Sequence, residues 1–297
     1  MYALTPARCN LPPLRRAPCR QAASTTTTST TITTTQNPAA LGRRAAANPD
    51  YDSLRSTWQH RAWTAAGTAA VLSSLSASAS LAASDGASYA PLVVSAVAAY
   101  SLADLATGVY HWLVDNYGSP STAVFGAQIA AFQGHHRVPA TITHRDPCNN
   151  LHALACAAAF LLPPTDLALS AAHAPASAHA FAATFAACVV LSQQSHAWAH
   201  ESRRRLPPAV LALQAAGVLV SRAQHGRHHR PPYDTNYCIV SGMWNGVLDQ
   251  YRVFEALEMV IFFRTGIRPR SWDETQAEWR EEDVVDAATA GDDADSS

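Results

Sequence analysis

The 297-residue chain has a net charge of -1, and 48% of its residues are hydrophobic while only 14% are charged. A soluble globular protein carries about 25% charged residues, so this balance favours a protein that lies in a membrane. The near-neutral charge gives no signal for nucleic-acid binding, and we expect no nucleic-acid partner. The six cysteines form no CxxC pair, which gives no support to a zinc ribbon or a disulfide framework.

Both ends of the chain differ in composition from the middle. Residues 1–49 contain no acid and six arginines, and eleven of the twelve residues 24–35 are serine or threonine. This composition predicts a cleaved chloroplast transit peptide over 1–49, with a disordered cytosolic tail as the alternative. A linker over 50–61 follows it. Residues 273–297 carry ten acids and one basic residue, which predicts an acidic disordered tail.

Two apolar segments near the start of the middle region predict membrane-spanning helices. They are Ala62–Ala83 and Ala90–Val114, and Asp104 is the only charged residue in either. Each is close to the roughly 20 residues that a spanning helix needs. Their apolar residues are mostly alanine, which leaves helical hairpins buried in a soluble bundle as an alternative.

Three later segments are weaker candidates. Leu151–Leu169 is interrupted by Pro163-Pro164, and Ala178–Leu191 is short unless it extends toward His196. Pro207–Val220 suits the membrane interface better than a span. The sequence therefore predicts an all-α membrane protein, a helical bundle of about four spans over residues 62–272.

Eight histidines recur in pairs and clusters beside these apolar segments. They are His111, His135, His136, His196, His200, His225, His228 and His229. Residues three and four apart share a helix face, so His196 and His200 can point the same way, as can the histidines of 225–229. Imidazole binds iron, copper, nickel and zinc, and eight such ligands suit two metal ions with about four each. The pattern predicts a metal site.

Two aspartates accompany one of these histidines. Asp104, His111 and Asp115 are spaced i, i+7 and i+11, so they lie close to one helix face. Ionisable groups at membrane depth are costly and mark functional sites. A single buried histidine can also be a satisfied core residue, so His111 by itself decides nothing.

The number of histidines bears on which metal chemistry they serve. A zinc hydrolase uses three protein ligands and a water, and a haem held by two histidines uses two. A pair of irons bound mainly by imidazole would use nearly all eight and would, with oxygen, attack an unactivated C–H bond. The count favours iron. A zinc-dependent membrane hydrolase, or a metal transporter or assembly protein without catalysis, stays open as the alternative.

Six motifs follow one another between Leu102 and Trp272. They are Asp104-x6-His111-Trp112-x2-Asp115, Gly134-His135-His136-Arg137, Asn150-Leu151-His152, Gln194-x-His196-x-Trp198-x-His200, His225-x2-His228-His229 and Asn236-Tyr237-Cys238-x4-Gly242-x2-Asn245. Together they resemble the plant chloroplast phosphatidylglycerol desaturase family, whose enzymes place a trans-3 double bond in the palmitoyl chain of that lipid. They are also similar to the plasmanylethanolamine desaturases, which form the vinyl ether of plasmalogens.

The resemblance implies a ligand set for two iron ions (Fe2+/Fe3+) at one membrane face. Its members are His111, His135, His136, His196, His200, His225, His228 and His229. The resemblance also implies that Asp104, Asp115 and His152 are metal ligands or orient them, and His152 is closer to the plant branch. We expect His144 to lie outside the metal site, and His173 and His179 to lie in a loop.

The implied reaction is an oxygen- and electron-dependent desaturation of a chain still esterified in phosphatidylglycerol. The resemblance places it in a multi-pass protein of the thylakoid or envelope membrane of the chloroplast, with ferredoxin as the electron donor. Four arginines beside the ligands are candidates for contacting the lipid phosphate, or only balance the carboxylates. They are Arg137, Arg145, Arg227 and Arg230. A plasmanylethanolamine desaturase, or another lipid desaturase or hydroxylase, is the alternative within this class.

Overall fold

The computed structural model describes residues 51–86 and 88–273, and every regular element among them is helical. Four of these helices are long and apolar enough to cross a membrane. They are α1 (Trp58–Ser84), α2 (Ala90–Asn116), α4 (Pro147–Ala171) and α5 (Ala176–His200). The predicted all-α fold with about four spans is confirmed. The predicted transit peptide and the acidic tail from residue 274 lie outside the described residues.

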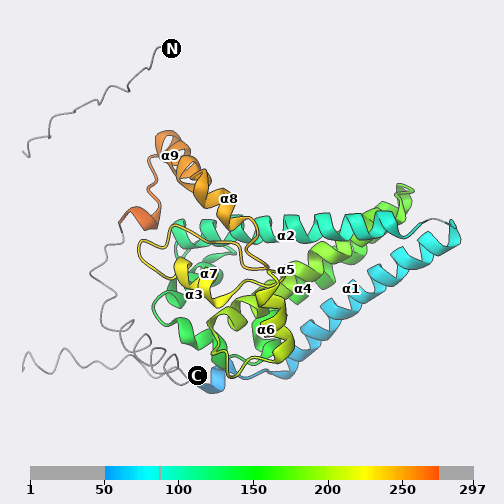
Figure 1. The fold of residues 1–297 in the computed structure, drawn as a ribbon, viewed down its shortest axis with the longest axis horizontal. Helices are drawn as coiled ribbons and strands as arrows, with labels where there is room; N and C mark the ends of the chain where they lie inside the picture. The colour runs from blue at the N-terminus through cyan, green and yellow to red at the C-terminus, as the bar shows by residue number, and fades with distance from the viewer. Residues whose placement is uncertain (1–50, 87, 274–297) are drawn as a thin grey trace, which may run out of the picture. The chain divides into compact units, whose positions relative to one another are not determined.

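The four long helices form one bundle with α5 at its centre. Helix α1 packs on α4 and α5, α4 also packs on α5, and α2 packs on α5 from another side. Figure 1 shows the α1–α2 and α4–α5 turns at one end of this bundle and the shorter elements gathered at the other end. Those are η2 (Tyr51–Leu54), α3 (Gly126–His135), η3 (Pro139–His144), α6 (Pro208–Ala215), α7 (Arg222–His228), α8 (Asn245–Gln250), α9 (Val253–Thr265) and η4 (Arg270–Trp272).

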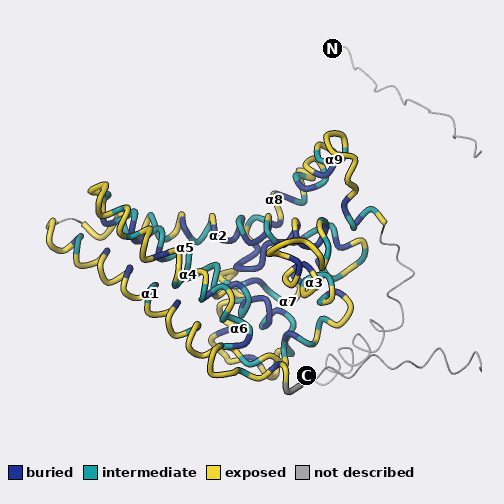
Figure 2. The backbone as a smooth tube through the Cα atoms, turned by 180° about the vertical axis from the view of Figure 1, so that it is seen from behind, coloured by how far each residue is buried: buried dark blue, intermediate teal, exposed yellow. Residues whose placement is uncertain are grey.

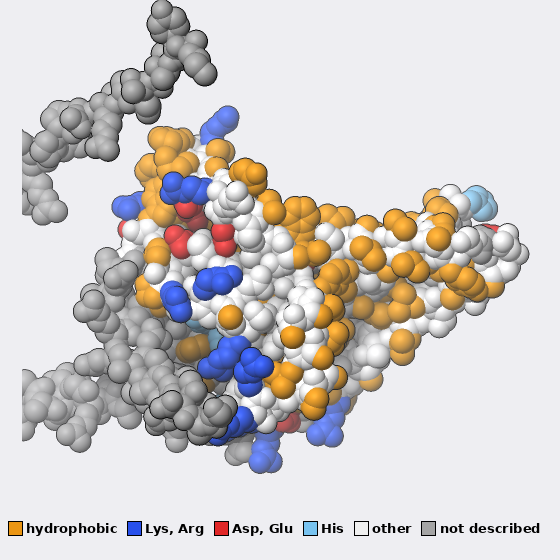
Figure 3. All heavy atoms as spheres, in the orientation of Figure 1, with side chains coloured by type: hydrophobic (Ala, Val, Ile, Leu, Met, Phe, Trp, Pro, Cys, Tyr) orange, Lys and Arg blue, Asp and Glu red, His pale blue; other side chains and the backbone are white. Residues whose placement is uncertain are grey.

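The outer surface of the four-helix bundle is apolar. Large hydrophobic side chains point outward on it, among them Leu72, Val93, Val94, Phe160 and Leu167. Figure 2 shows this outer surface mostly as exposed residues, with the buried chain concentrated among the shorter elements. On the face shown in Figure 3, hydrophobic side chains cover the bundle while charged ones gather at the other end. This distribution suits helices that face lipid.

Small residues line the contacts between the spanning helices. A Cβ on Gly67 would lie 2.3 Å from the carbonyl oxygen of Ala155, so only glycine lets α1 approach α4 this closely. Ala99, Ala103 and Ala183 are also fully buried. Membrane helices associate through such small residues because lipid gives no hydrophobic drive between them.

The structure corrects two of the sequence-based expectations for the spanning helices α1 and α4. Helix α1 begins at Trp58 instead of Ala62, because Thr57 and His60 form a capping box. Helix α4 runs unbroken through Pro163-Pro164, so the expected interruption is wrong. Prolines are tolerated in membrane helices where neighbouring helices support the chain, and α1 and α5 both pack on α4.

Helix α5 extends beyond the predicted apolar segment Ala178–Leu191 at both ends. It extends to His200, and it begins at Ala176 directly after Pro175. His179 is therefore buried in its first turn, with Nδ1 at 2.7 Å from Asp166 Oδ1, and the expected loop position was wrong. His173 does lie in the turn between α4 and α5. Pro207–Val220 contains only the eight-residue α6 and forms no span.

Candidate metal centre

All eight predicted ligands come from helix ends on the same side of the bundle. His111 and Asp115 lie in the last turns of α2, and His196 and His200 close α5. The other five histidines come from the shorter elements: His135 ends α3 with His136 as its cap, and α7 carries His225 and His228 with His229 as its cap. The backbone of a helix end is rigid, so the positions of these helix ends determine where the ring nitrogens come together.

Five imidazoles form a first group, which we call the five-histidine group. It consists of His135, His196, His200, His225 and His229, with one ring nitrogen of each within 4.8 Å of all the others. His200 Nε2 lies 2.8 Å from His225 Nε2, 2.9 Å from His135 Nε2 and 3.3 Å from His196 Nε2. The five nitrogens thus converge on one small volume.

Three further imidazoles and a carboxylate form a second group, which we call the Asp115 group. Asp115 Oδ2 lies 3.2 Å from His111 Nε2, 3.3 Å from His136 Nε2 and 3.4 Å from His228 Nε2. All four side chains are buried. Each of the eight histidines predicted as a ligand therefore falls in one of two adjacent groups, whose rings His111 and His196 have centroids 5.7 Å apart.

Backbone carbonyls fix the proton of two rings in the Asp115 group. His111 Nδ1 lies 2.9 Å from the carbonyl oxygen of Tyr237, and His228 Nδ1 lies 2.8 Å from that of Thr235. A carbonyl can only accept, so both Nδ1 atoms carry the proton and donate it. The Nε2 lone pairs are left pointing into the group, which is the arrangement that metal-binding histidines show.

The chemistry of both groups fits bound cations. Among the described residues, the buried polar atoms without a hydrogen-bond partner include His111 Nε2 and both carboxylate oxygens of Asp115. Buried acceptors that face each other without a donor are costly, and a cation between them removes that cost. Burial, together with neighbouring imidazoles, holds the pKa of His135, His225 and His229 well below the ordinary histidine value. Neutral imidazole is the form that binds metal.

Asp104, the other predicted carboxylate, lies outside both groups and holds a loop. Its Oδ1 accepts backbone N–H groups of Val240, Ser241 and Gly242 at 3.1, 2.8 and 2.9 Å. Its Oδ2 accepts the N–H of Trp244 at 3.3 Å. We call residues 240–244 the Asp104-held loop. Asp104 therefore orients the segment that carries the Tyr237 carbonyl and does not face the candidate metals.

The segment just before this loop packs directly on α2. A Cβ on Gly108 would lie 2.3 Å from Cys238 Sγ, so glycine lets the segment approach the helix. Asn245 accepts the Cys238 N–H at 2.8 Å and donates back to its carbonyl oxygen at 3.2 Å. The sequence alone assigned no role to this motif. The spacing between Asn236-Tyr237-Cys238 and Asn245 was the sequence feature that could have indicated this contact.

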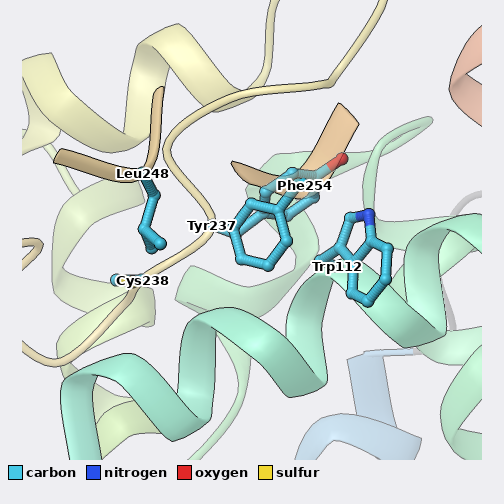
Figure 4. Close-up of a cluster of buried hydrophobic side chains, with 5 residues drawn as sticks. All are labelled: Trp112, Tyr237, Cys238, Leu248 and Phe254. Atoms are coloured by element: carbon cyan, nitrogen blue, oxygen red, sulfur yellow. The ribbon is translucent and has the colours of Figure 1, made fainter. Parts of the chain in front are cut away.

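A cluster of buried hydrophobic side chains supports the Asp115 group from behind. Trp112, Tyr237, Cys238, Leu248 and Phe254 form it, as Figure 4 shows. The ring of Tyr237 has its centroid 5.7 Å from that of His111, and Trp112 stacks on Phe254. This packing fixes the segment whose carbonyls orient the histidines.

An apolar cavity of about 700 Å³ opens beside the five-histidine group. His135 and His196 form part of its wall, and apolar side chains such as Phe132, Leu154 and Phe185 form most of the rest. Ligand cavities of roughly 300–1,000 Å³ are typical of small-molecule sites. Two of the predicted ligands are therefore in contact with a space large enough for an acyl chain.

Of the remaining predicted site residues, some line this cavity and others do not. Arg145 and His152 line it, Arg145 donates from Nη1 to Asn149 Oδ1 at 3.3 Å, and the His152 ring stacks on His60 with centroids 4.0 Å apart. The other three candidate arginines, Arg137, Arg227 and Arg230, are exposed and do not line it. Arg227 donates instead to Asn236 Oδ1.

Two buried groups of metal-ligand side chains, one beside an apolar cavity, define a membrane protein with a candidate metal centre that faces a lipid-sized space. Comparison with known proteins agrees. A lipid desaturase domain matches residues 100–272, and the chain belongs to that family. It is an oxidoreductase of lipids. No solved structure shows a significant match.

Individual relatives refine this assignment. The chain is 53% identical over 229 residues to the chloroplastic fatty acid desaturase 4 of Arabidopsis thaliana, covering 77% of this chain and 69% of the relative. It is 47% identical to the chloroplastic fatty acid desaturase 4-like 1 of the same plant, covering 77% and 76%. It is 32% identical to the plasmanylethanolamine desaturase of Myxococcus xanthus, covering 61% and 65%. With its four apolar helices, the chain is a multi-pass chloroplast membrane protein.

Proposed function

We propose that this protein introduces a trans-3 double bond into the palmitoyl chain of chloroplast phosphatidylglycerol. The observation that carries the proposal is the apolar cavity of about 700 Å³ whose wall includes His135 and His196 of the five-histidine group. An acyl chain in that cavity would lie against candidate metal ligands. The higher identity to fatty acid desaturases, 53% against 32%, supports an acyl chain over a plasmanyl ether.

The two groups would hold two iron ions. In this proposal the five-histidine group holds one iron, and the other lies among His111, Asp115, His136 and His228. When bound, the iron pair supplies, with O2 and two electrons, the oxidising power to remove hydrogen from an unactivated carbon, which no side-chain base can do. Two hydrogens leave adjacent carbons, and O2 takes up these atoms with the two electrons and two protons to give two molecules of water.

The protein's own residues would then position the lipid. Arg145 is the one candidate arginine on the cavity wall, and Asn149, Asn150 and His152 line the same region. A guanidinium there binds a phosphate oxygen by charge-assisted hydrogen bonds. Anchoring the head group beside the histidines brings the first carbons of the chain, and not its middle, against them. This geometry is the reason for a double bond near the ester.

The electron donor belongs to the same proposal. A desaturation consumes two electrons, and a small one-electron carrier such as ferredoxin is the reductant that suits a chloroplast membrane protein. The support for it is the compartment of the relatives and not a contact of any residue.

The test is a lipid profile with and without the gene. Gas chromatography of the acyl chains of plastid phosphatidylglycerol should show a trans-3-hexadecenoyl species that disappears when the gene is inactivated and returns with the wild-type chain. A chain with His200→Ala should fail to restore it. An unchanged trans-3 species together with a lost vinyl ether or a lost cis double bond would contradict the proposal.

A further inference from the structure

The cavity follows one face of α5 away from the five-histidine group. The α5 residues that line it are Phe185, Val189, Ser192, Gln193 and His196. Their spacing of four, three, one and three residues keeps them on a single helix face. At 1.5 Å per residue, the face from Phe185 to His196 is about 16 Å long. Helix α5 thus forms a straight wall of that length.

The two ends of this wall differ in polarity. At the histidine end, Asn150 donates from Nδ2 to the carbonyl oxygen of Gln193 at 2.8 Å, which places the polar start of α4 at that level. Arg145 lines the cavity in the same region. At the other end the lining is Leu154, Val189 and Phe185, which are apolar. An anionic head group therefore fits at the histidine end, and the methyl end of the chain fits toward Phe185.

The length of the wall matches one chain length. A C–C bond of about 1.5 Å advances an extended chain by about 1.25 Å per carbon, so the stretch from C3 to C16 of a palmitoyl chain is about 16 Å long. With C3 beside His196, the terminal methyl would reach Phe185. The ring of Phe181 stacks behind that of Phe185, with centroids 6.2 Å apart and 12° between their planes.

We propose that Phe185 is the end of the acyl-chain site and sets its length at sixteen carbons. This inference rests on the proposed function, which determines the carbon of the chain that lies beside the histidines. The Phe185 ring lies at the far end of this wall, on the same face of α5 as His196, and a chain two carbons longer would have to displace it or bend. A difference of a methylene or two in such a pocket is worth roughly tenfold or more in selectivity.

The experiment uses the full-length protein in nanodiscs that contain equal amounts of phosphatidylglycerol with a palmitoyl or a stearoyl chain, supplied with O2 and with reduced ferredoxin as the electron donor. The first readout is the ratio of desaturated C16 to C18 chains. The second is the binding preference of chelator-treated protein for the two lipids, measured by native mass spectrometry. The variants are Phe185→Ala, Phe185→Leu as a milder change, and Phe185→Trp. The control is Phe160→Ala, because Phe160 is 63% exposed on α4 and does not line the cavity.

Wild type and the Phe160→Ala control should favour C16 roughly tenfold in both readouts. Phe185→Ala and Phe185→Leu should move both ratios toward C18, and Phe185→Trp should lower binding of C16 as well. Desaturation with an unmoved C16:C18 ratio in the Phe185 variants would overturn the inference while leaving the proposed function intact. A shifted binding ratio with no double bond formed in either chain would support the inference and contradict the proposed function.

Discussion

Replacing Asp104 by asparagine should destabilise the protein while leaving its metal sites occupied. The carboxylate accepts three backbone N–H groups of the Asp104-held loop at Oδ1 and that of Trp244 at Oδ2. Asn keeps one acceptor oxygen and no charge. Hydrogen bonds to charged groups contribute about 1.5–3 kcal/mol and neutral ones about 0.5–1.5, so three weakened bonds cost about 3 kcal/mol together. The orphaned Trp244 N–H adds about 1 kcal/mol.

The assay is thermal unfolding in detergent micelles together with metal analysis of the same samples. A loss of about 4 kcal/mol corresponds to a fall in Tm of roughly 8–16 °C for a domain of this size. Asp85→Asn, an exposed change at the end of α1, is the matched control and should leave Tm unchanged. Asp115→Asn should instead lower the metal content. An Asp104→Asn protein with wild-type Tm and depleted metal would refute the assignment of Asp104 to the loop.

Three further substitutions test separate parts of the structure. Arg145→Ala should raise KM for phosphatidylglycerol about tenfold or more with a smaller change in kcat, measured in nanodiscs, whereas the same change at Arg137, which does not line the cavity, should leave KM alone. Glu258→Gln should cost about 1–3 kcal/mol in thermal unfolding, because the two Glu258 oxygens accept the indole N–H groups of Trp112 and Trp272 and an amide keeps only one acceptor. His179→Ala should lower Tm by several degrees, since its ring nitrogen bonds the Asp166 carboxylate, yet leave the metal content unchanged.

Local spacing predicted that the histidines cluster, but not that they divide into two groups. Spacing along the chain places His196 and His200 on one face of α5, and the structure agrees. It could not reveal that His135 and His136 point into different groups, because that depends on how the end of α3 meets α7 and α2. Adjacent residues at a helix end diverge, and only the tertiary packing shows what each one meets.

The two aspartates on α2 show the same limit. Asp104 and Asp115 share a helix face, so their spacing gives them equal claims as ligands. Asp115 meets three imidazoles, whereas Asp104 meets the backbone of the Asp104-held loop, which is more than 130 residues away in sequence. The expected loop position of His179 was wrong for a related reason. The composition of the surrounding segment is typical of a loop, yet α5 begins directly after Pro175. The cavity and the Phe185 end of its wall likewise depend on contacts between helices.

The most direct test of the central claim is the metal content of the purified full-length protein, determined by elemental analysis and Mössbauer spectroscopy on iron-57-enriched samples. Eight imidazoles and Asp115 in two groups predict about two iron atoms per chain. The spectrum should show two irons in nitrogen-rich sites, and His200→Ala and His228→Ala should each deplete them. About one zinc atom per chain with no iron would contradict the account and assign the histidines to a different chemistry.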